Sequence, residues 1–342
     1  MFTNRTPQYH GKPLNSSIAC IEQVCLGGLE QSILIRGTDV DSPILLFLHG
    51  GPGEAQIGYA RHYQSELEKH FIVVNWDQRG AGLSYTHPDH KNPLTMTQLI
   101  NDTIELIAYL LERFSKQKLF IAGHGFGSMI GILTAKLIPE DIYAYIGVGQ
   151  LVDINQSDIT AYHLALLHAD LINHHRALNQ LHKIGAPPYA DHKKYFTLLK
   201  WLSKFGAVTK EGSKADFLAK GKKSTEYRFR DWRKYEKGRL HAFKQLLPEL
   251  IDFNLYERIT HLTIPTYFCI GRYDFVSSYE MQEDYVEVLE TPHKEIIWFD
   301  KSAHYPHFEE PTPFLIACLK IKRDTLAASG KIIPFPKKAV SF

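Results

Sequence analysis

One glycine-rich turn carries the spacing that most directly suggests chemistry. The turn is GHGFG at residues 123–127, which follows the apolar run 119–122 and precedes an apolar stretch from Ser128. A strand, a sharp turn and a helix in this order form the nucleophile elbow G-x-S-x-G, which presents a serine hydroxyl at the end of a sheet. The central residue here is Gly125 instead of serine. The turn therefore predicts an acyl-transfer site whose nucleophile position has no side chain.

Two later loops supply the acid and the base that such a site needs. Asp274 and His304 each follow a short apolar run of the kind that forms a buried strand. The chain order of elbow, acid and histidine is known for Ser-His-Asp triads. In this arrangement His304 takes the proton from the nucleophile, while Asp274 fixes the imidazole tautomer and stabilises the imidazolium. Asp300 and His307 are the alternatives, but Asp300 precedes the histidine loop and His307 is expected to face the last helix.

A second glycine-rich turn, HGGPG at residues 49–53, follows the apolar run 44–48. Glycines let the backbone approach a tetrahedral oxyanion, so the N–H groups of Gly51 and Phe126 are the predicted oxyanion-hole donors. Each such donor contributes roughly 3–4 kcal/mol to stabilisation of the transition state. Gly50, in the same turn, is a predicted substrate-binding residue.

Other polar residues near these turns have simpler explanations. Ser128 lies one helical turn beyond the elbow and is expected to point elsewhere, and Ser84 is a second hydroxyl near the site. Asp77 and Arg79 are expected to form an ion pair that braces a turn. The elbow could also begin a dinucleotide-binding turn, but the next predicted strand ends without the acidic residue that this fingerprint requires.

Short apolar runs that alternate with helix-like stretches predict a parallel sheet with helices on both faces. Residues 17–25 and 29–36 alternate in polarity around Gly27-Gly28 and predict an antiparallel hairpin at its edge. Helices are expected over 55–70 and 95–114, among others. The predicted fold class is α/β, with a mostly parallel eight-stranded sheet. The carboxyl ends of its strands bring the three loops together.

The alternation stops near residue 150 and resumes after residue 250. We assign residues 1–150 and 251–330 to a core, residues 151–250 to a helical insert that caps the site, and residues 331–342 to a C-terminal tail. Residues 222–244 carry nine basic and three acidic residues, which could indicate a nucleic-acid surface but is more typical of a solvated helix face. Four aromatic residues of the insert are expected to line the ligand site: Tyr162, Phe196, Trp201 and Trp232.

Composition excludes several other classes of protein. The 342 residues are 44% hydrophobic with a formal net charge of +2, which favours a folded chain without a strongly charged partner. The four cysteines have no metal-ligand or disulfide spacing. No secretory signal and no apolar run of about 18 residues is visible. We therefore expect a cytoplasmic protein that acts on a small molecule and binds no nucleic acid, membrane, metal or cofactor.

These motifs together resemble the proline iminopeptidase branch of the α/β-hydrolases. The resemblance rests on HGGPG, DQRGAGLS, the elbow, GRYD and SAH in this order, and it covers about residues 40–150 and 255–320. It implies an α/β-hydrolase fold, a triad with Asp274 and His304, and an oxyanion hole at Gly51 and Phe126. Gly125 departs from the family pattern, in which a serine is expected.

The resemblance leaves the substrate open. Proline iminopeptidases hold the free amine of the substrate with acids of the cap, and the insert offers five candidates: Asp153, Asp158, Glu226, Asp231 and Glu236. The aromatic and basic insert, including Trp232 as a substrate-binding candidate, favours a bulky ester or lactone, such as a macrolide. The alternatives are an aminopeptidase, a non-catalytic binding protein on a hydrolase fold, and an oxidoreductase.

Three explanations account for a glycine at the nucleophile position. They are an engineered replacement of serine, a natural loss of the nucleophile, and a nucleophile elsewhere in the chain. The first is favoured because Asp274, His304 and the glycine turns all remain.

Overall fold

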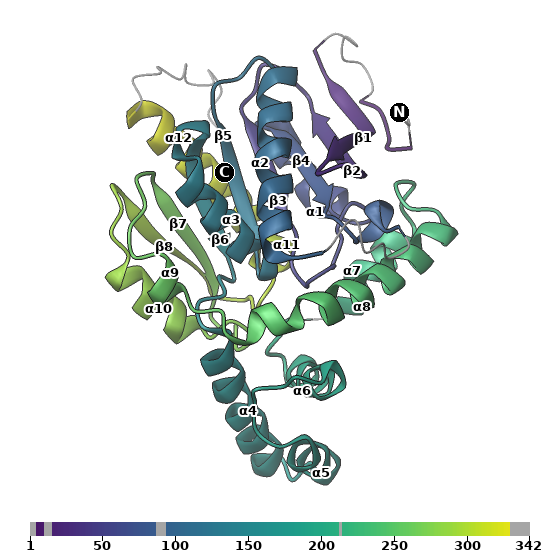
Figure 1. Cartoon of the computed structure of the whole chain (residues 1–342), viewed down its shortest axis with the longest axis vertical. Coiled ribbons are helices and arrows are strands. Elements are labelled where there is room, and N and C mark those ends of the chain that lie inside the picture. The colour runs from purple at the N-terminus through teal and green to yellow at the C-terminus, as the bar shows by residue number, and fades with distance from the viewer. Residues whose placement is uncertain (1–4, 10–15, 87–93, 212–213, 329–342) are drawn as a thin grey trace, which may run out of the picture.

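An eight-stranded sheet runs through the computed structural model of the chain, which describes residues 5–9, 16–86, 94–211 and 214–328 (Figure 1). The strands are β1 (Ile18–Leu26), β2 (Leu29–Gly37), β3 (Ile44–Leu48), β4 (Ile72–Asp77), β5 (Leu119–His124), β6 (Ile142–Val148), β7 (Thr266–Gly271) and β8 (Lys294–Phe299). Their order across the sheet is β1-β2-β4-β3-β5-β6-β7-β8. The pairs β1–β2 and β2–β4 are antiparallel, and the others are parallel. The predicted α/β class with a mostly parallel eight-stranded sheet is confirmed.

Alternation along the strands divides the core into two layers. In β3, Leu46 belongs to the layer beneath α2 (Met96–Arg113) and α3 (Phe126–Leu137), whereas Leu45 and Phe47 face the layer beneath α12 (Pro311–Ala328). Both layers are fully buried, which explains why the inner strands read as continuous apolar runs. The helices of the two core segments are α1 (Arg61–Gln64), α2 (Met96–Arg113), α3 (Phe126–Leu137), α9 (Leu255–Arg258), α10 (Tyr279–Val288), α11 (Pro306–Glu309) and α12 (Pro311–Ala328).

The insert between β6 and α9 is helical, with no strand in its described residues. Its helices are α4 (Ile154–Leu171), α5 (His175–Ile184), α6 (His192–Lys204), α7 (Lys214–Lys222) and α8 (Phe229–Ile251). Figure 1 shows α8 crossing below the carboxyl ends of the strands, with α4, α5 and α6 extending away from the sheet. The insert thus lies on the side of the sheet where the predicted loops converge.

The single helix predicted over residues 55–70 is wrong. The structure has only α1 and a short 3₁₀ turn, Leu67–Lys69, in this stretch. Gly58 lies close beneath the insert, since a Cβ there would be 2.9 Å from the ring of Tyr227. Because contacts of this kind come from residues distant in sequence, local periodicity did not reveal them.

No helix in the described ranges is long and apolar enough to cross a membrane. The predicted tail at residues 331–342 lies outside the described residues.

Candidate active site

The elbow turn holds Gly125 between the end of β5 and the start of α3. Its φ of +50° and ψ of −115° lie in a region that glycine reaches at little cost and other residues adopt only under strain. Gly127 is required by close packing, because a Cβ there would lie 2.2 Å from the carbonyl oxygen of Leu48. The turn therefore has the sharp strand-to-helix geometry of a nucleophile elbow, with residue 125 at its apex.

The loops after β7 and β8 bring Asp274 and His304 into contact. His304 Nδ1 lies 3.0 Å from Asp274 Oδ2. The buried Asp274 carboxylate also accepts hydrogen bonds from the backbone N–H groups of Val276 and Ser277, at 3.0 Å each, and from the Ser277 hydroxyl. Burial would raise the pKa of Asp274, but the charge of His304 and the hydrogen bonds from His304 and Ser277 hold it below its ordinary value. The ionised carboxylate places the proton of a neutral His304 on Nδ1.

The other ring nitrogen of His304 faces Gly125. A Cβ built on Gly125 would lie 2.8 Å from His304 Nε2 and 3.4 Å from its Cε1. The hydrogen bonds of this ring run to Asp274 and Ser277 through Nδ1, and no partner of Nε2 occurs in the part of the chain that the structure describes. The lone pair of Nε2 is thus free to accept a proton from a group near residue 125.

Two further histidines pack around His304. His124 Nε2 donates to the carbonyl oxygen of His304 at 2.9 Å, and burial together with the charge of His304 lowers the pKa of His124 to about 3. His307 is buried, and neither of its ring nitrogens has a partner among the described residues. Burial, with His124 and His304 nearby, lowers the pKa of His307 well below its ordinary value. Both rings are therefore neutral at pH 7.

The two turns that carry the predicted oxyanion-hole donors border one cavity. Phe126 is the first residue of α3, so its N–H is one of the four that have no partner within the helix. Gly51 lies in the turn after β3, and both residues line the same cavity. Gly50 packs against the elbow, because a Cβ on it would lie 2.7 Å from His124 Nδ1. The two predicted donors thus border one space next to the elbow, where an oxyanion hole would have to lie.

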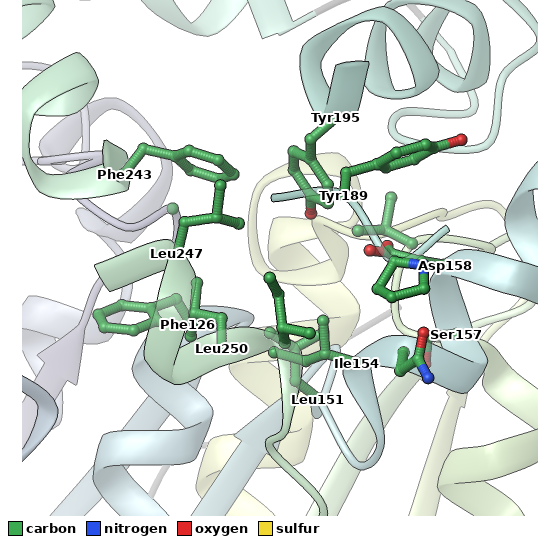
Figure 2. Close-up of a pocket in the computed structure, with 15 residues that line it drawn as sticks. Phe126, Leu151, Ile154, Ser157, Asp158, Tyr189, Tyr195, Phe243, Leu247 and Leu250 are labelled. Atoms are coloured by element: carbon green, nitrogen blue, oxygen red, sulfur yellow. The ribbon is translucent and has the colours of Figure 1, made fainter. Parts of the chain in front are cut away.

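The cavity beside Gly51 and Phe126 has a volume of about 30 Å³ and is closed mainly by the insert (Figure 2). Its wall is largely apolar and aromatic. The residues that form this wall include Leu151, Ile154, Tyr189, Tyr195, Phe243, Leu247 and Leu250. A ligand bound at the elbow would therefore contact helices α4, α6 and α8.

Three polar residues of α4 interrupt this apolar wall: Asn155, Ser157 and Asp158. Asn155 and Asp158 lie one helical turn apart. Asn155 Oδ1 is buried without a hydrogen-bond partner, and Asp158 has no ion pair within the described ranges. Figure 2 shows Asp158 directed toward the cavity. Burial raises the pKa of Asp158 to about 8, with no cation to oppose the effect.

The other four acidic candidates of the insert have protein partners. Glu226 pairs with Arg61 at 2.6 Å, and Asp231 pairs with Arg5 at 3.1 Å. Asp153 accepts a hydrogen bond from the backbone N–H of Gln156 at the start of α4, and Glu236 lies 3.4 Å from Arg239. Asp158 is thus the member of the set that is left for a ligand, a distinction that the sequence did not make.

None of the four aromatic residues expected at the ligand site lines the cavity beside Gly51. Tyr162 and Trp201 are buried in a hydrophobic cluster of the insert, and Phe196 packs on the ring of Phe243 at 4.8 Å. Trp232 lines a separate open groove with Phe229 and Arg233. Tyr162, Phe196 and Trp201 thus serve the packing of α4 and α6 against their neighbours.

The two candidate hydroxyls are engaged in backbone hydrogen bonds. Ser128 donates to the carbonyl oxygen of Gly125 at 2.6 Å and accepts from the N–H of Leu151 at 3.1 Å. Ser84 donates to the carbonyl oxygen of Asp77 and accepts from the N–H of Ser32. Both side chains therefore brace loops.

The expected ion pair between Asp77 and Arg79 is wrong. Arg79 pairs with Asp102 of α2, with nitrogen–oxygen distances of 2.6 and 2.8 Å. Asp77 instead accepts hydrogen bonds from Tyr227 of the insert and from the backbone N–H of Leu83. The two side chains thus brace different parts of the molecule, a divergence that their closeness in sequence did not reveal.

Glu54, which the sequence analysis did not single out, connects three parts of the site. It follows the HGGPG turn, accepts a hydrogen bond from the Tyr305 hydroxyl at 2.8 Å, and forms an ion pair with Lys214 of α7. Burial would raise the pKa of Glu54, but Lys214, Arg239 and the Tyr305 hydrogen bond lower it to about 2. The turn that carries Gly51, the loop of His304 and the insert are thus held together through one carboxylate.

Comparisons with known proteins identify the family and the fold that this chain shares. The family described as "Serine aminopeptidase, S33" matches residues 41–311. The probable aminopeptidase YbaC of Bacillus subtilis is 36% identical over 314 residues, which cover 88% of this chain and 96% of that protein. A proline iminopeptidase structure from Mycobacterium smegmatis superposes with a TM-score of 0.66 at 18% identity, over 90% of this chain and 99% of that chain. A proline iminopeptidase-related protein from Thermus thermophilus gives a TM-score of 0.60 at 21% identity, over 90% and 97% of the two chains.

Proposed function

Because the chain belongs to the serine aminopeptidase family S33 of the α/β-hydrolases, we propose that its site is built to hydrolyse an amide that lies close to a free amine. In this proposal Gly125 stands where the serine nucleophile belongs. His304 is the base, Asp274 orients it, and the N–H groups of Gly51 and Phe126 bind the oxyanion. Similarity to a probable aminopeptidase over nearly the whole chain supports the reaction class.

The contacts of these residues account for each step once residue 125 is a serine. His304 Nε2 takes the hydroxyl proton, and Oγ attacks the carbonyl carbon of the substrate. The oxyanion accepts hydrogen bonds from the two turns that border the cavity. His304 then gives its proton to the leaving amine, and a water molecule releases the acyl group by the same sequence.

The choice of an amine substrate rests on Asn155 and Asp158, which have no partners among the described residues. A carboxylate in an apolar wall, without a cation of its own, is costly and is stabilised by a bound ammonium group. The amide oxygen of Asn155 supplies a second acceptor one helical turn away. An ammonium group has three donors and no acceptor, so it matches this pair.

A bulky ester or lactone is the second candidate. The observation that favours it is the apolar wall formed by Phe243, Leu247 and Leu250 of α8, which would accept an uncharged acyl group. Such a substrate would leave Asp158 without a partner, and we therefore rank it second.

We further propose that Gly125 replaces a serine, so that the chain with Gly125 binds substrate but lacks the covalent step. Support comes from the hydrogen-bonded pair of Asp274 and His304, which keeps the geometry of a working acid and base. The hydroxyls of Ser84 and Ser128 are committed to backbone groups and offer no substitute.

The proposal is tested in a Gly125→Ser background with substrates that differ only in the amine. An aminoacyl 4-nitroanilide, its N-acetyl derivative and a 4-nitrophenyl ester of similar size form the panel. We expect kcat/KM for the free amine to exceed that for the acetylated compound by about tenfold or more, the equivalent of one charged hydrogen bond. Asp158→Asn should remove this preference, whereas Asp170→Asn, an exposed acid on the same helix, should keep it. A preference for the acetylated compound or the ester would favour the second candidate.

A further inference from the structure

We propose that the chain with Gly125 is a slow hydrolase in its own right, in which His304 activates a water molecule that attacks the substrate directly. The inference rests on the proposed function, because it uses the same acid, base and oxyanion donors. It differs in chemistry, since no acyl-enzyme forms. The nucleophile is a solvent molecule that His304 Nε2 holds next to residue 125, which has no side chain.

The base has the orientation that this reaction needs. Asp274 accepts from the Nδ1 side of His304 at 3.0 Å, so Nε2 presents its lone pair. That nitrogen lies 2.8 Å from the place of a Cβ on Gly125 and has no hydrogen-bond partner within the described residues. A nearly buried imidazole nitrogen that accepts no hydrogen bond from the protein is a strong site for a water donor.

The space around residue 125 suits one small nucleophile. Because residue 125 is glycine, no side-chain atom separates Nε2 from the turn that carries Phe126. A cavity of about 30 Å³ borders Gly51 and Phe126, although neither Gly125 nor His304 lines it, and roughly 10–15 Å³ of such volume is enough for one water molecule. A water bound to Nε2 would lie at residue 125, one residue before the proposed donor Phe126.

Three neighbouring groups that could compete for this role are engaged elsewhere. Ser128 donates its proton to the carbonyl oxygen of Gly125, and Ser84 donates to that of Asp77. His124 is neutral and uses Nε2 to donate to the carbonyl oxygen of His304. The Nε2 atom of His304 is thus the available base.

The reaction is a single displacement. One water proton moves to His304 Nε2 while the water oxygen forms a bond with the carbonyl carbon, and the carbonyl oxygen becomes an oxyanion bound by Gly51 and Phe126. The intermediate collapses with loss of the leaving group, which takes the proton from the imidazolium. The products are the free acid and the alcohol or amine, and His304 returns to its neutral form.

The test compares hydrolysis of 4-nitrophenyl acetate by four forms of the full chain: Gly125, Gly125→Ala, His304→Ala and Asp170→Asn. The Gly125 form should hydrolyse the ester at least tenfold faster than His304→Ala, and pretreatment with a fluorophosphonate should leave this rate unchanged. Gly125→Ala should be slower than the Gly125 form, because its Cβ would otherwise lie 2.8 Å from Nε2 and must push the imidazole ring and the bound water from their positions. Asp170→Asn should match the Gly125 form. Melting curves and ¹H NMR of the histidine region report whether each variant is folded.

Quenched samples analysed by intact mass separate the two mechanisms. The Gly125 form should show no acetylated protein during turnover, whereas Gly125→Ser should show one acetyl group. Equal rates for Gly125 and a folded Gly125→Ala, equal rates for Gly125 and His304→Ala, or an acetyl adduct on the Gly125 form would each overturn the inference. If Gly125→Ser is active while the Gly125 form shows no His304-dependent rate, the inference fails alone. If neither form acts on any substrate of the panel, the proposed function fails with it.

Discussion

The two walls of the candidate active site differ in whether their polar groups have hydrogen-bond partners within the protein. On the sheet side, Asp274 accepts hydrogen bonds from His304, Val276 and Ser277, so the acid and base are held in one geometry. On the insert side, Asn155 Oδ1 and the Asp158 carboxylate line the cavity without a partner among the described residues. The first wall is organised before a ligand arrives, as catalysis requires. In the proposed function the ligand completes the second wall, which would make it the part of the site that selects the substrate.

The largest effect should come from adding the missing nucleophile to the wall that holds Asp274 and His304, here called the organised wall. Gly125→Ser should raise kcat for the aminoacyl 4-nitroanilide by roughly 10⁴–10⁶ over the Gly125 form, as expected when the nucleophile of a triad is restored. The His304 ring must shift slightly, because the new Cβ would otherwise lie 2.8 Å from Nε2. The measurement is steady-state kcat together with fluorophosphonate labelling by intact mass. A label on Ser84 or Ser128 in the Gly125 form would contradict the assignment of residue 125.

The next effect distinguishes two buried histidines that are three residues apart. In the Gly125→Ser background, His304→Ala should lower kcat by roughly 10⁴, because the hydroxyl loses its base. His307→Ala should cost far less activity, since its neutral ring has no hydrogen-bond partner within the described residues. Both variants are compared by kcat and by melting temperature. The opposite ranking in folded proteins would refute the choice of base.

Substitutions in the insert wall, which holds Asn155 and Asp158, should change KM more than kcat. Asp158→Asn in the Gly125→Ser background should raise KM for amine substrates by roughly 10–100-fold with a small change in kcat, because a hydrogen bond to a charged group is lost. Asp170→Asn, at the exposed end of α4, is the matched control. A fall in kcat at constant KM would instead place Asp158 in the chemical step.

A smaller effect should appear in the pH dependence of KM. Burial raises the pKa of Asp158 to about 8, so its carboxyl group is mostly protonated and uncharged at pH 6. Binding of an ammonium group needs the ionised form, and KM for amine substrates should therefore fall by up to about tenfold between about pH 6 and 7. The same titration on Asp158→Asn should lose this trend. A KM that is independent of pH in both proteins would show that Asp158 does not bind the amine.

Motif order and strand topology made the organised wall predictable. The runs before Asp274 and His304 are strands β7 and β8 of the sheet, and parallel strands place their carboxyl ends at one edge. The positions of Gly51, Phe126 and Gly125 follow from two glycine turns at that same edge. These residues lie in loops of the core, so the order of the motifs along the chain was sufficient to predict that they lie close together.

The insert wall was not predictable because it depends on how helices pack. Asp158 could be separated from Glu226 and Asp231 only when their arginine partners, Arg61 and Arg5, were placed. Trp201 looked equally suitable for a ligand site, yet it fills the core of the insert. An amphipathic pattern shows which face of a helix is apolar, but it does not show which neighbour covers that face.

The insert closes the cavity beside the elbow and stands in the path of an entering ligand. The wall of the cavity comes largely from α8 and its neighbours, so a ligand that reaches Gly51 passes side chains of the insert. Opening of the insert would then govern the association rate constant, which should lie well below the diffusion limit. The ion pair between Glu54 and Lys214 joins the core to the insert. Because salt screens such pairs, the salt concentration should affect the rate at which a ligand enters.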